Sequence, residues 1–572
     1  LGHMYYRYFM WNFVGRQNDI QGQGMDYERG NWISGIAALD EGRVGPQKDY
    51  PPVKMANKGR NVYYGLPLLL GLIGLIYHYR KDQKDFWVVT FLFILTGIAI
   101  NVYLNPEPLQ PRERDYAYVG SFYAFAIWIG LGVMGLWDLL RKKAPETVAA
   151  AAVTAVCLVA VPGILAAENW DDHDRSGKYT ARDFAINYLE SCAPNAIIFT
   201  MGDNDTYPLW YVQEVEGFRT DVRVVNLSLL GTDWYINQLR RQINNSPAIK
   251  LSIGPEKIVQ GVRDYVPFYD RKIQGAVDLR QVLQFATSDD ASAKLPTQGG
   301  EMVNYYPSKR FVIPVDKAAV LAQGAVTAAD TANVLSAIEW EYPRNAILKN
   351  DLIVLDILAN NGWERPIYWT VSMGAEQYLG LEDYFQLEGL AYRFVPIYTP
   401  SRGGQTSRVA DNIMYENMVK KFKWGGMNTG IYIDPETSRM TINLRSNATR
   451  LAESLLAKGD SVRAREVLDV VMREMPHSHV PLMIFNYRMV ELYHLAGSSE
   501  QANALAKDLF NMFESEAKYF RTLRGKYATF YERDMQNAMA IMQEMVRMAN
   551  QYGQPDLAKD FQARFDAIGR AG

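Results

Sequence analysis

The strongest constraint on this chain comes from two long apolar runs that flank a short charged loop. Residues 86–104 contain no formally charged side chain, and residues 119–140 contain only Asp138. As a helix, each run is long enough to cross about 30 Å of hydrocarbon. Prolines in the intervening NPEPLQPRERDY exclude a regular helix there, so its backbone needs water, lipid headgroups or other protein as hydrogen-bond partners. The sequence therefore predicts two membrane-spanning helices joined by a loop at one face of the membrane.

Two further apolar runs, residues 62–79 and 147–167, bring the predicted spans to four. The short connections RKDQKD and RKKAPE, which join the first span to the second and the third to the fourth, are basic. Short basic loops remain in the cytoplasm, so the N-terminal segment, the charged loop and everything after Glu168 are predicted to share the outer side. The N-terminal segment also contains many Lys and Arg, mixed with Asp and Glu, but long segments obey the charge rule poorly.

The charged loop carries Arg112, Glu113, Arg114 and Asp115. Arginine is never neutral and binds phosphate through two hydrogen bonds, so Arg112 and Arg114 are predicted to bind the phosphate of a lipid. The alternative is a self-paired turn whose side chains only mark the membrane interface. Polar groups at membrane depth are costly, and this cost favours a functional role for the loop.

The segment before the first apolar run opens with an aromatic cluster and continues as a stretch rich in Gly, Asn, Gln and Asp. Tyr and Trp concentrate where membrane meets water, so this segment is predicted to lie at the outer interface. It combines a ring for stacking with amides for hydrogen bonding, as a sugar-binding wall requires. A capped turn is the alternative interpretation. The residues concerned are Trp11, Asn12, Arg16, Gln17, Asn18 and Asp19.

Beyond the apolar runs, the pattern changes to alternating strands and helices. Residues 196–201 and 221–230 are predicted strands with a helix between them, which is a parallel unit of a soluble α/β domain. Asp203, Asn204 and Asp205 follow the first strand. Ligands bind at this position in open α/β sheets, so these residues are predicted to bind sugar or acceptor. The alternatives are an ordinary strand-to-helix turn and a hydrolase-like site that uses Asp203 or Asp205 with a metal.

A later piece of the α/β domain has the same mixture of aromatic and polar residues. Residues 351–360 are predicted as a helix and residues 366–371 as a strand. Trp363, Glu364 and Arg365 lie between these two elements. They are predicted to face the same site as the residues that follow the first strand.

From residue 447 the chain is predicted to be helical to its end. Helix pairs with turns at Gly459 and Gly497 recur with a period of roughly 34 to 40 residues, which indicates tetratricopeptide-like repeats. Such repeats stack and leave a groove for partners. A stripe of methionines in the last helices is predicted to be core. These methionines are Met535, Met539, Met542, Met545 and Met548.

The predicted fold class is an α-helical transmembrane bundle followed by a soluble α/β domain and a C-terminal helical repeat domain. An interfacial segment occupies residues 1–60, and four transmembrane helices occupy residues 61–168. The α/β domain spans residues 169–440, and the tetratricopeptide-like repeats span residues 441–572.

Several function classes are excluded by composition. A net charge of −3 leaves no basic footprint for nucleic acid. Two cysteines, Cys157 and Cys192, exclude a disulfide framework and a cysteine-based zinc site. No nucleophile elbow, phosphate-cradling glycine loop or HExxH motif occurs, and no metal site is predicted. The chain begins at Leu1 without a signal peptide and is expected to be part of a longer protein.

Three long motifs carry a resemblance to a known family: WNFVGRQND, PRERDYAYVGSFYAFAIWIG and MGDNDTYPLWYVQEVEGFRTDVRVVN. The chain resembles the C-terminal part of a large bacterial inner-membrane family, labelled a domain of unknown function. That family is related to the protein O-mannosyltransferases and to an animal O-mannosyltransferase with a tetratricopeptide tail. The resemblance implies a multi-pass GT-C type glycosyltransferase with its C-terminal domains in the periplasm. Its donor would be a polyprenyl-phosphate sugar, which is a substrate, and no cofactor is expected.

The resemblance also implies a division of chemical roles. Transfer to a protein Ser or Thr needs a carboxylate that takes the hydroxyl proton and positive charge that stabilises the departing lipid phosphate. Families of this type carry the catalytic acid in the first outer loop, upstream of this chain; Asp19 and Asp115 are the candidates within it. Arg112 and Arg114 are the candidates for the phosphate. The alternative function is a non-enzymatic membrane anchor that presents the α/β and repeat module for assembly of an envelope or secretion complex.

Overall fold

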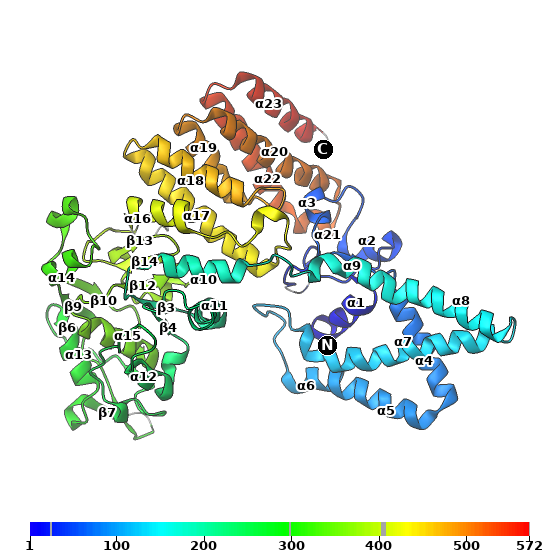
Figure 1. The fold of residues 1–572 in the computed structure, drawn as a ribbon, viewed down its shortest axis with the longest axis horizontal. Helices are drawn as coiled ribbons and strands as arrows, with labels where there is room; N and C mark the ends of the chain where they lie inside the picture. Colours follow the sequence, from blue (N-terminus) through cyan, green and yellow to red (C-terminus); the bar gives the residue numbers. More distant parts are fainter. Residues whose placement is uncertain (23, 25, 297–298, 402–407, 571–572) are drawn as a thin grey trace.

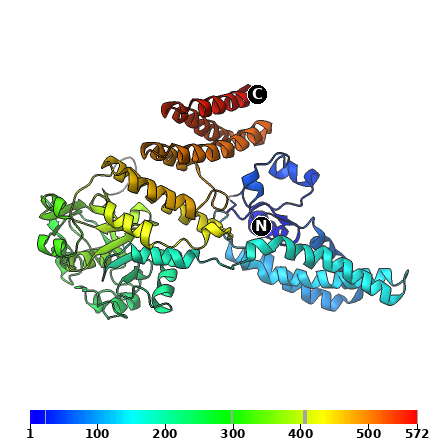
Figure 2. The same cartoon turned by 45° about the horizontal axis from the view of Figure 1, so that its top comes forward.

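The computed structural model describes residues 1–22, 24, 26–296, 299–401 and 408–570. The chain is mostly helical, with apolar helices at the N-terminal end, a mixed α/β region in the middle and a helical C-terminal region (Figure 1). Figure 2 shows the C-terminal helices above the junction of the other two parts.

Among the described residues, three helices are long and apolar enough to cross a membrane: Gln83–Leu104, Asp115–Leu140 and Glu146–His173. They correspond to three of the four predicted spans. The remaining predicted span is helix α4 (Leu66–Lys81), which has 16 residues and therefore covers only about 24 Å. A helix needs about 20 apolar residues to cross the hydrocarbon core, so the fourth span is not confirmed.

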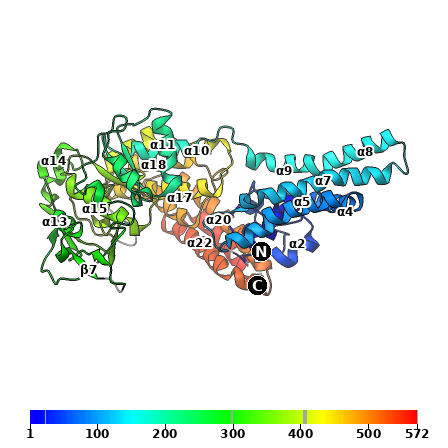
Figure 3. The same ribbon diagram turned by 90° about the horizontal axis from the view of Figure 1, so that it is seen from below.

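The apolar helices run side by side and project away from the rest of the molecule (Figure 3). Helix α7 contacts α4, α5 and α8. Short π-helical turns join α5 to α6 and α8 to α9, so each of these pairs continues as one helix. The bounds are α5 (Gln83–Ile94), α6 (Ile100–Leu104), α7 (Val119–Leu140), α8 (Glu146–Leu158) and α9 (Ile164–His173).

Helices α4 and α7 approach each other through glycines. A Cβ atom on Gly74 would lie 1.7 Å from the carbonyl oxygen of Trp128, and one on Gly132 would lie 2.2 Å from that of Leu70. Neither position admits a larger residue unless the backbone shifts. Small residues at helix interfaces allow membrane helices to pack this closely. Helix α4 is therefore held tightly in the bundle although it is short.

The aromatic opening segment also belongs to the bundle. Helix α1 (Arg7–Phe13) follows a π-helical turn at Gly2–Tyr6. The ring of Phe125 on α7 has its centroid 4.9 Å from that of Phe9 and 4.5 Å from that of Phe13. Aromatic packing thus places the N-terminal residues against the span that follows the charged loop.

A six-stranded sheet of order β15-β13-β14-β12-β3-β4 forms the centre of the described α/β region. Its strands β3 (Ile197–Thr200), β4 (Arg223–Asn226) and β12 (Ile367–Thr370) are parallel, with β3 in the middle. Helix α11 (Gly202–Glu214) connects β3 to β4, which confirms the predicted parallel unit. The chain returns on the other side of β3 as β12, so the strand connections reverse direction between β3 and β12.

The long segment between β4 and β12 contains small sheets and further helices. The helix predicted at residues 351–360 is α15, and most of its residues are buried. The bounds are α12 (Asp233–Leu239), β5 (Tyr265–Pro267), β6 (Val277–Asp278), α13 (Leu279–Ala286), β7 (Lys294–Pro296), β8 (Met302–Asn304), β9 (Arg310–Pro314), α14 (Lys317–Ala322), β10 (Ala337–Glu341), β11 (Ala346–Leu348) and α15 (Lys349–Asn360). The antiparallel part of the main sheet consists of β13 (Phe385–Leu387) and β14 (Ala391–Phe394), and β15 (Arg408–Val409) pairs parallel with β13.

A buried ion pair lies in this antiparallel part. Glu388 Oε1 is 3.5 Å from Arg393 Nη1, and both side chains are 2% exposed. The Tyr368 hydroxyl and the Gln386 amide each donate a hydrogen bond of 2.7 Å to the same carboxylate. The donors satisfy both oxygens of Glu388, as a buried charge requires.

The C-terminal region consists of paired helices: α17 packs on α18, α19 on α20, and α22 on α23. Gly459, Gly497 and Gly553 form the turns with φ of +81°, +77° and +66°, a conformation that favours glycine. The first two turns confirm the prediction, and the third was not predicted; the assignment to tetratricopeptide repeats stays a prediction. The bounds are α17 (Pro435–Ala457), α18 (Ser461–Glu474), α19 (Tyr487–Leu495), α20 (Ser499–Thr522), α21 (Lys526–Phe530), α22 (Glu532–Gln551) and α23 (Pro555–Arg570).

The methionine stripe on α22 faces the core of this region. Met542, Met545 and Met548 are buried, and Met535 and Met539 are half-buried. The prediction that these side chains are core is therefore confirmed, most fully for the last three.

The segment before α4 contacts the C-terminal helices. The Tyr519 hydroxyl donates to the carbonyl of Pro46 at 3.0 Å, and the Tyr527 hydroxyl donates to that of Glu41, also at 3.0 Å. The ring of Tyr50 packs edge-on against Tyr519, with centroids 5.2 Å apart. The predicted interfacial segment is thus held between the apolar bundle and the helical region.

Candidate functional site

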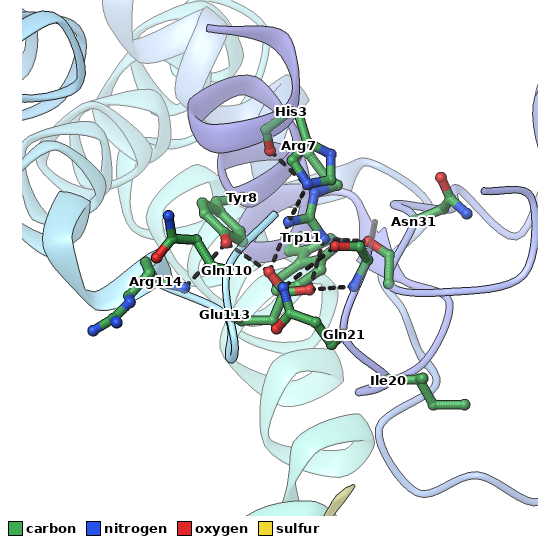
Figure 4. Close-up of polar contacts among 12 residues, drawn as sticks. His3, Arg7, Tyr8, Trp11, Ile20, Gln21, Asn31, Gln110, Glu113 and Arg114 are labelled. Atoms are coloured by element: carbon green, nitrogen blue, oxygen red, sulfur yellow. Dashed lines mark hydrogen bonds and ion pairs between the residues drawn. The ribbon is translucent and has the colours of Figure 1, made fainter. Parts of the chain in front are cut away.

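Glu113 attaches the charged loop to helix α1. Its Oε2 accepts hydrogen bonds from Arg7 Nη2 at 2.7 Å and from the Tyr8 hydroxyl at 2.6 Å (Figure 4). Its Oε1 accepts from Arg7 Nη1 at 3.0 Å and from the Gly22 N–H at 2.8 Å. The side chains of Arg7 and Glu113 are only 7% and 11% exposed. The loop is therefore anchored by a bidentate ion pair that is largely removed from solvent.

The surroundings hold Glu113 in its charged form. Burial alone would raise the pKa of this carboxyl, but the hydrogen bonds and charge of Arg7, with the bonds from Gly22 and Tyr8, lower the pKa below its ordinary value. Burial keeps the pKa of the Tyr8 hydroxyl well above its ordinary value, so Tyr8 remains a neutral donor. The anchor is therefore a carboxylate surrounded by donors.

Arg112 and Arg114 flank this anchor, and neither guanidinium binds Glu113. The backbone N–H of Arg114 donates to the Tyr8 hydroxyl at 3.0 Å, whereas its guanidinium points away from Glu113 (Figure 4). That guanidinium donates to the Tyr116 hydroxyl at 2.7 Å. Arg112 is exposed. Within the described part of the chain, neither arginine forms an ion pair with a carboxylate. The loop is thus not the self-paired turn considered as an alternative, because Glu113 pairs with Arg7.

Asp115, one of the two candidate catalytic carboxylates, is half-buried at the start of a 3₁₀ turn that leads into α7. The other candidate, Asp19, is buried and lies in a different place. Its Oδ1 accepts from Asn57 Nδ2 at 3.0 Å, and its Oδ2 accepts from the hydroxyl of Tyr432, shortly before α17. Asp19 therefore links the N-terminal segment to the start of the helical region.

The predicted sugar-binding wall forms contacts inside the protein. The Trp11 indole donates to the Gly30 carbonyl at 3.0 Å, and the guanidinium carbons of Arg7 and Arg16 lie 4.5 and 4.3 Å from its ring centre. Asn12 donates to the carbonyl of Tyr8 at 2.8 Å, within its own helix.

Gln17 and Asn18, the other amides of this wall, are buried. The Asn31 amide donates to Gln17 Oε1 at 2.9 Å, and the Gly30 N–H donates to Asn18 Oδ1, also at 2.9 Å. These bonds close the loop that also supplies the Gly22 donor to Glu113. A sugar contact by these residues stays a prediction, and the structure gives them the task of bracing this loop.

A second polar group lies at the carboxyl ends of β3 and β12. Asp205 Oδ2 accepts hydrogen bonds from Ser372 Oγ at 2.6 Å and from Thr370 Oγ1 at 3.3 Å. Burial raises the pKa of this carboxyl. Asp203 and Asn204 are exposed beside it. This carboxyl edge is where open α/β sheets bind ligands.

Arg365 does not face this carboxyl edge. Its Nε donates to the carbonyl of Asn195 at 2.8 Å, and its Nη2 donates to Ser246 Oγ at 3.0 Å. Asn195 precedes β3 and Arg365 precedes β12, so both lie at the amino ends of the parallel strands. The prediction that residues 363–365 share a site with Asp203 is therefore wrong, because a residue before a strand lies at the opposite edge from one that follows it.

Sequence analysis missed Arg7, Tyr8 and Ser372. Arg7 stands alone in an aromatic stretch, and an isolated charge among rings was the available signal that it has a distant partner. Ser372 directly follows a predicted strand, so its place at the carboxyl edge could have been inferred. Among the described residues, no group of three or more His, Cys, Asp or Glu side chains could hold a metal ion.

Comparison with known families matches the α/β region and leaves the charged loop unmatched. A search of curated proteins and of solved structures found no match. The family comparison carries no link to mannosyltransferases or to a bacterial source, so that part of the resemblance stays a prediction. Residues 181–413, which include the parallel strands and Asp205, match the model of TMEM260-associated domain 2, a domain family of unknown function.

Proposed function

We propose that this chain is part of a membrane glycosyltransferase that transfers a sugar from a polyprenyl-phosphate donor to Ser or Thr of a protein, and that Arg112 and Arg114 bind the donor phosphate. One observation supports this most: Arg7 neutralises Glu113, so two guanidinium groups remain beside it without a carboxylate partner among the described residues. A phosphate accepts paired hydrogen bonds from such groups.

The position of the loop supports binding of a lipid phosphate in particular. The loop joins the candidate spans Gln83–Leu104 and Asp115–Leu140. Tyr103, Tyr116 and Tyr123 are exposed near this loop. Exposed tyrosines at the end of a span are typical of the level of the lipid headgroups. A guanidinium at that level meets the phosphate of a membrane-anchored donor without leaving the interface.

The chemistry assigns the remaining roles. The acceptor oxygen forms a bond to the anomeric carbon, the bond between that carbon and the phosphate oxygen breaks, and the phosphate leaves with the electron pair. Arg112 and Arg114 stabilise the charge that develops on this leaving group. Asp115 is the candidate within this chain for the base that takes the hydroxyl proton, because it lies in the same loop. Both oxygens of Asp19 already accept hydrogen bonds.

The experiment compares sugar transfer by the full-length protein with that of the double variant Arg112→Ala/Arg114→Ala. Membranes receive radiolabelled polyprenyl-phosphate-mannose, and transfer to protein is measured at equal abundance of each variant. Loss of two charge-assisted hydrogen bonds of about 1.5 kcal/mol each lowers the rate by about 100-fold. The matched control is Lys142→Ala/Lys143→Ala, which removes two exposed charges at the other end of α7. Equal transfer by the two double variants would refute the assignment of the phosphate.

A non-enzymatic scaffold is the second candidate function. The contacts of Tyr519 with Pro46 and of Tyr527 with Glu41 hold the helical region on the N-terminal segment. This arrangement suits a module that is presented to partners in a fixed orientation. Stable stoichiometric partners in a detergent pull-down, with no transfer from any lipid-linked sugar, would favour the scaffold over the enzyme.

A further inference from the structure

A row of aromatic side chains borders the carboxyl ends of β3 and β4. We call it the aromatic ridge; it consists of Tyr207 and Trp210 on α11 and Trp234 and Tyr235 on α12, helices that lie beside β4 in Figure 1. Tyr207 stacks on Trp210 with ring centroids 5.5 Å apart, and Tyr235 lies 6.5 Å from Trp210 and 5.6 Å from Trp234. Contacts between successive rings make the ridge continuous.

The ridge is buried in its middle and open at its ends. Tyr235 is buried, and its hydroxyl accepts a hydrogen bond of 2.9 Å from the N–H of Asn226, the last residue of β4. Tyr207 is 50% exposed and Trp234 is 58% exposed. The inner ring therefore fixes the ridge to the sheet, and the outer rings are available to a ligand. Exposure of two large aromatic rings to water is unfavourable, and a ligand that covers them would remove this apolar surface from water.

Polar side chains beside the ridge offer hydrogen bonds without positive charge. Asp203 lies one helical turn before Tyr207 on α11, and the charge of its carboxylate raises the pKa of the Tyr207 hydroxyl. Ser228, which follows β4, is exposed and its Oγ contacts Met201 Sδ at 3.7 Å. Within the described chain, Asp203 forms no ion pair with Lys or Arg. A carboxylate of this kind accepts hydrogen bonds and repels phosphate.

We propose that the aromatic ridge, with Asp203 and Ser228, binds a neutral carbohydrate. One face of a pyranose ring presents C–H groups, which pack on an aromatic ring and shield that ring from water. The hydroxyl groups at the edge of the sugar donate hydrogen bonds to carboxylate and hydroxyl oxygens. The ridge lies at the carboxyl edge of the parallel strands, the usual place for ligands in this kind of sheet. The negative charge of Asp203 beside the ridge disfavours an anionic ligand.

This inference does not depend on lipid phosphate binding, because the ridge and the charged loop share no residue. It gives the α/β region a ligand of its own, with sugar as the chemical class. A failure of either proposal therefore leaves the other intact.

The test titrates the full-length protein in detergent with neutral trisaccharides (mannotriose, cellotriose and chitotriose), and binding is measured by ligand-observed NMR. We expect at least one trisaccharide to bind, with saturation transfer to the C–H protons of one ring face. Affinity should fall by about tenfold or more in Trp234→Ala and in Tyr207→Ala. Asp203→Asn, which keeps the fold and removes the charge, should also weaken binding.

Matched controls are available because other rings are equally exposed elsewhere. Trp170→Ala removes a 73% exposed tryptophan at the end of α9, and Tyr269→Ala removes a 49% exposed tyrosine after β5. Both should bind the trisaccharide like the unmodified chain. Absence of binding at about 10 mM of every trisaccharide, or equal affinity in ridge and control variants, would overturn the proposal. Loss of a co-purifying protein from the ridge variants, with sugar binding unchanged, would identify a protein interface and overturn it as well.

Discussion

Replacing Glu113 with alanine is expected to release the charged loop from helix α1. The carboxylate accepts two hydrogen bonds from Arg7, one from Tyr8 and one from the Gly22 amide. Loss of one partner of a buried ion pair costs about 3 to 5 kcal/mol, because the other charge is left uncompensated. With exposures of 7% and 11%, this pair is slightly open to solvent, so we expect about 3 kcal/mol.

A change of about 3 kcal/mol raises the population of the detached loop by about 100-fold, and amide hydrogen exchange detects such an opening. The measurement is exchange of the backbone N–H groups of residues 105–116 in the detergent-solubilised protein. Glu107→Ala is the matched control, since Glu107 is an exposed glutamate in the same loop. The double variant Arg7→Ala/Glu113→Ala should recover part of the loss, because it leaves no unpaired charge. Equal exchange in Glu113→Ala and Glu107→Ala would show that the ion pair does not hold the loop.

The lowered pKa of Glu113 also makes the attachment of the loop depend on pH. Its pKa is lowered in the folded protein, so the unfolded chain takes up the proton first as the pH falls. The stabilisation is therefore complete above the ordinary glutamate pKa and is lost as the pH falls through the lowered value. We expect loop exchange, corrected for its intrinsic pH dependence, to accelerate only at acid pH, and Glu113→Gln to remove this transition.

Three further predictions concern packing and charge elsewhere. Gly132→Ala should destabilise the bundle by about 1 to 3 kcal/mol in thermal melts in detergent, because its Cβ would meet a backbone oxygen at 2.2 Å; Gly130→Ala on the same helix has nothing within 4 Å and should be neutral. Glu388→Ala should lower the melting temperature of the α/β region by about 10 °C, because Arg393 is then left buried and unpaired. The control Glu364→Ala should change the melting temperature little, because the ion pair of Glu364 with Lys250 is exposed. Burial raises the pKa of Asp205 in the fold, so stability should fall as the pH rises from the ordinary aspartate pKa through the raised value, and Asp205→Asn should flatten this slope in melts at several pH values.

Elements with a local pattern were predictable from the sequence, and long-range partnerships were not. Apolar length predicts the three helices that are long enough to cross a membrane, and alternating apolar runs predict β3, α11 and β4. Helix α4 is an exception, because it is apolar like a span but its 16 residues are too few to cross the hydrocarbon core. Apolar composition alone does not distinguish a short apolar helix from a span.

In the candidate site, too, local features were predictable and long-range partners were not. The charged loop stands out in the sequence, but the partner of Glu113 lies 106 residues away at Arg7, and no local spacing relates the two. The sequence therefore identified the arginines of the loop but not Arg7, which holds the loop through Glu113. The error for Arg365 has a related cause: the edge of a sheet on which a residue lies depends on whether it precedes or follows its strand.

Buried polar contacts join the N-terminal segment to the last candidate span and to the helical region. Asn61, in strand β2 (Asn61–Val62), donates to Asp172 Oδ2 at 3.3 Å near the end of α9. Asp19 binds Asn57 in the same segment and Tyr432 before α17. The N-terminal segment therefore contacts both the last candidate span and the entry to the helical region. Because these contacts are buried and charged, movement of the outer regions against the bundle must break them. The buried carboxylates of Asp19 and Asp172 would then lose hydrogen-bond partners, so these contacts resist such movement.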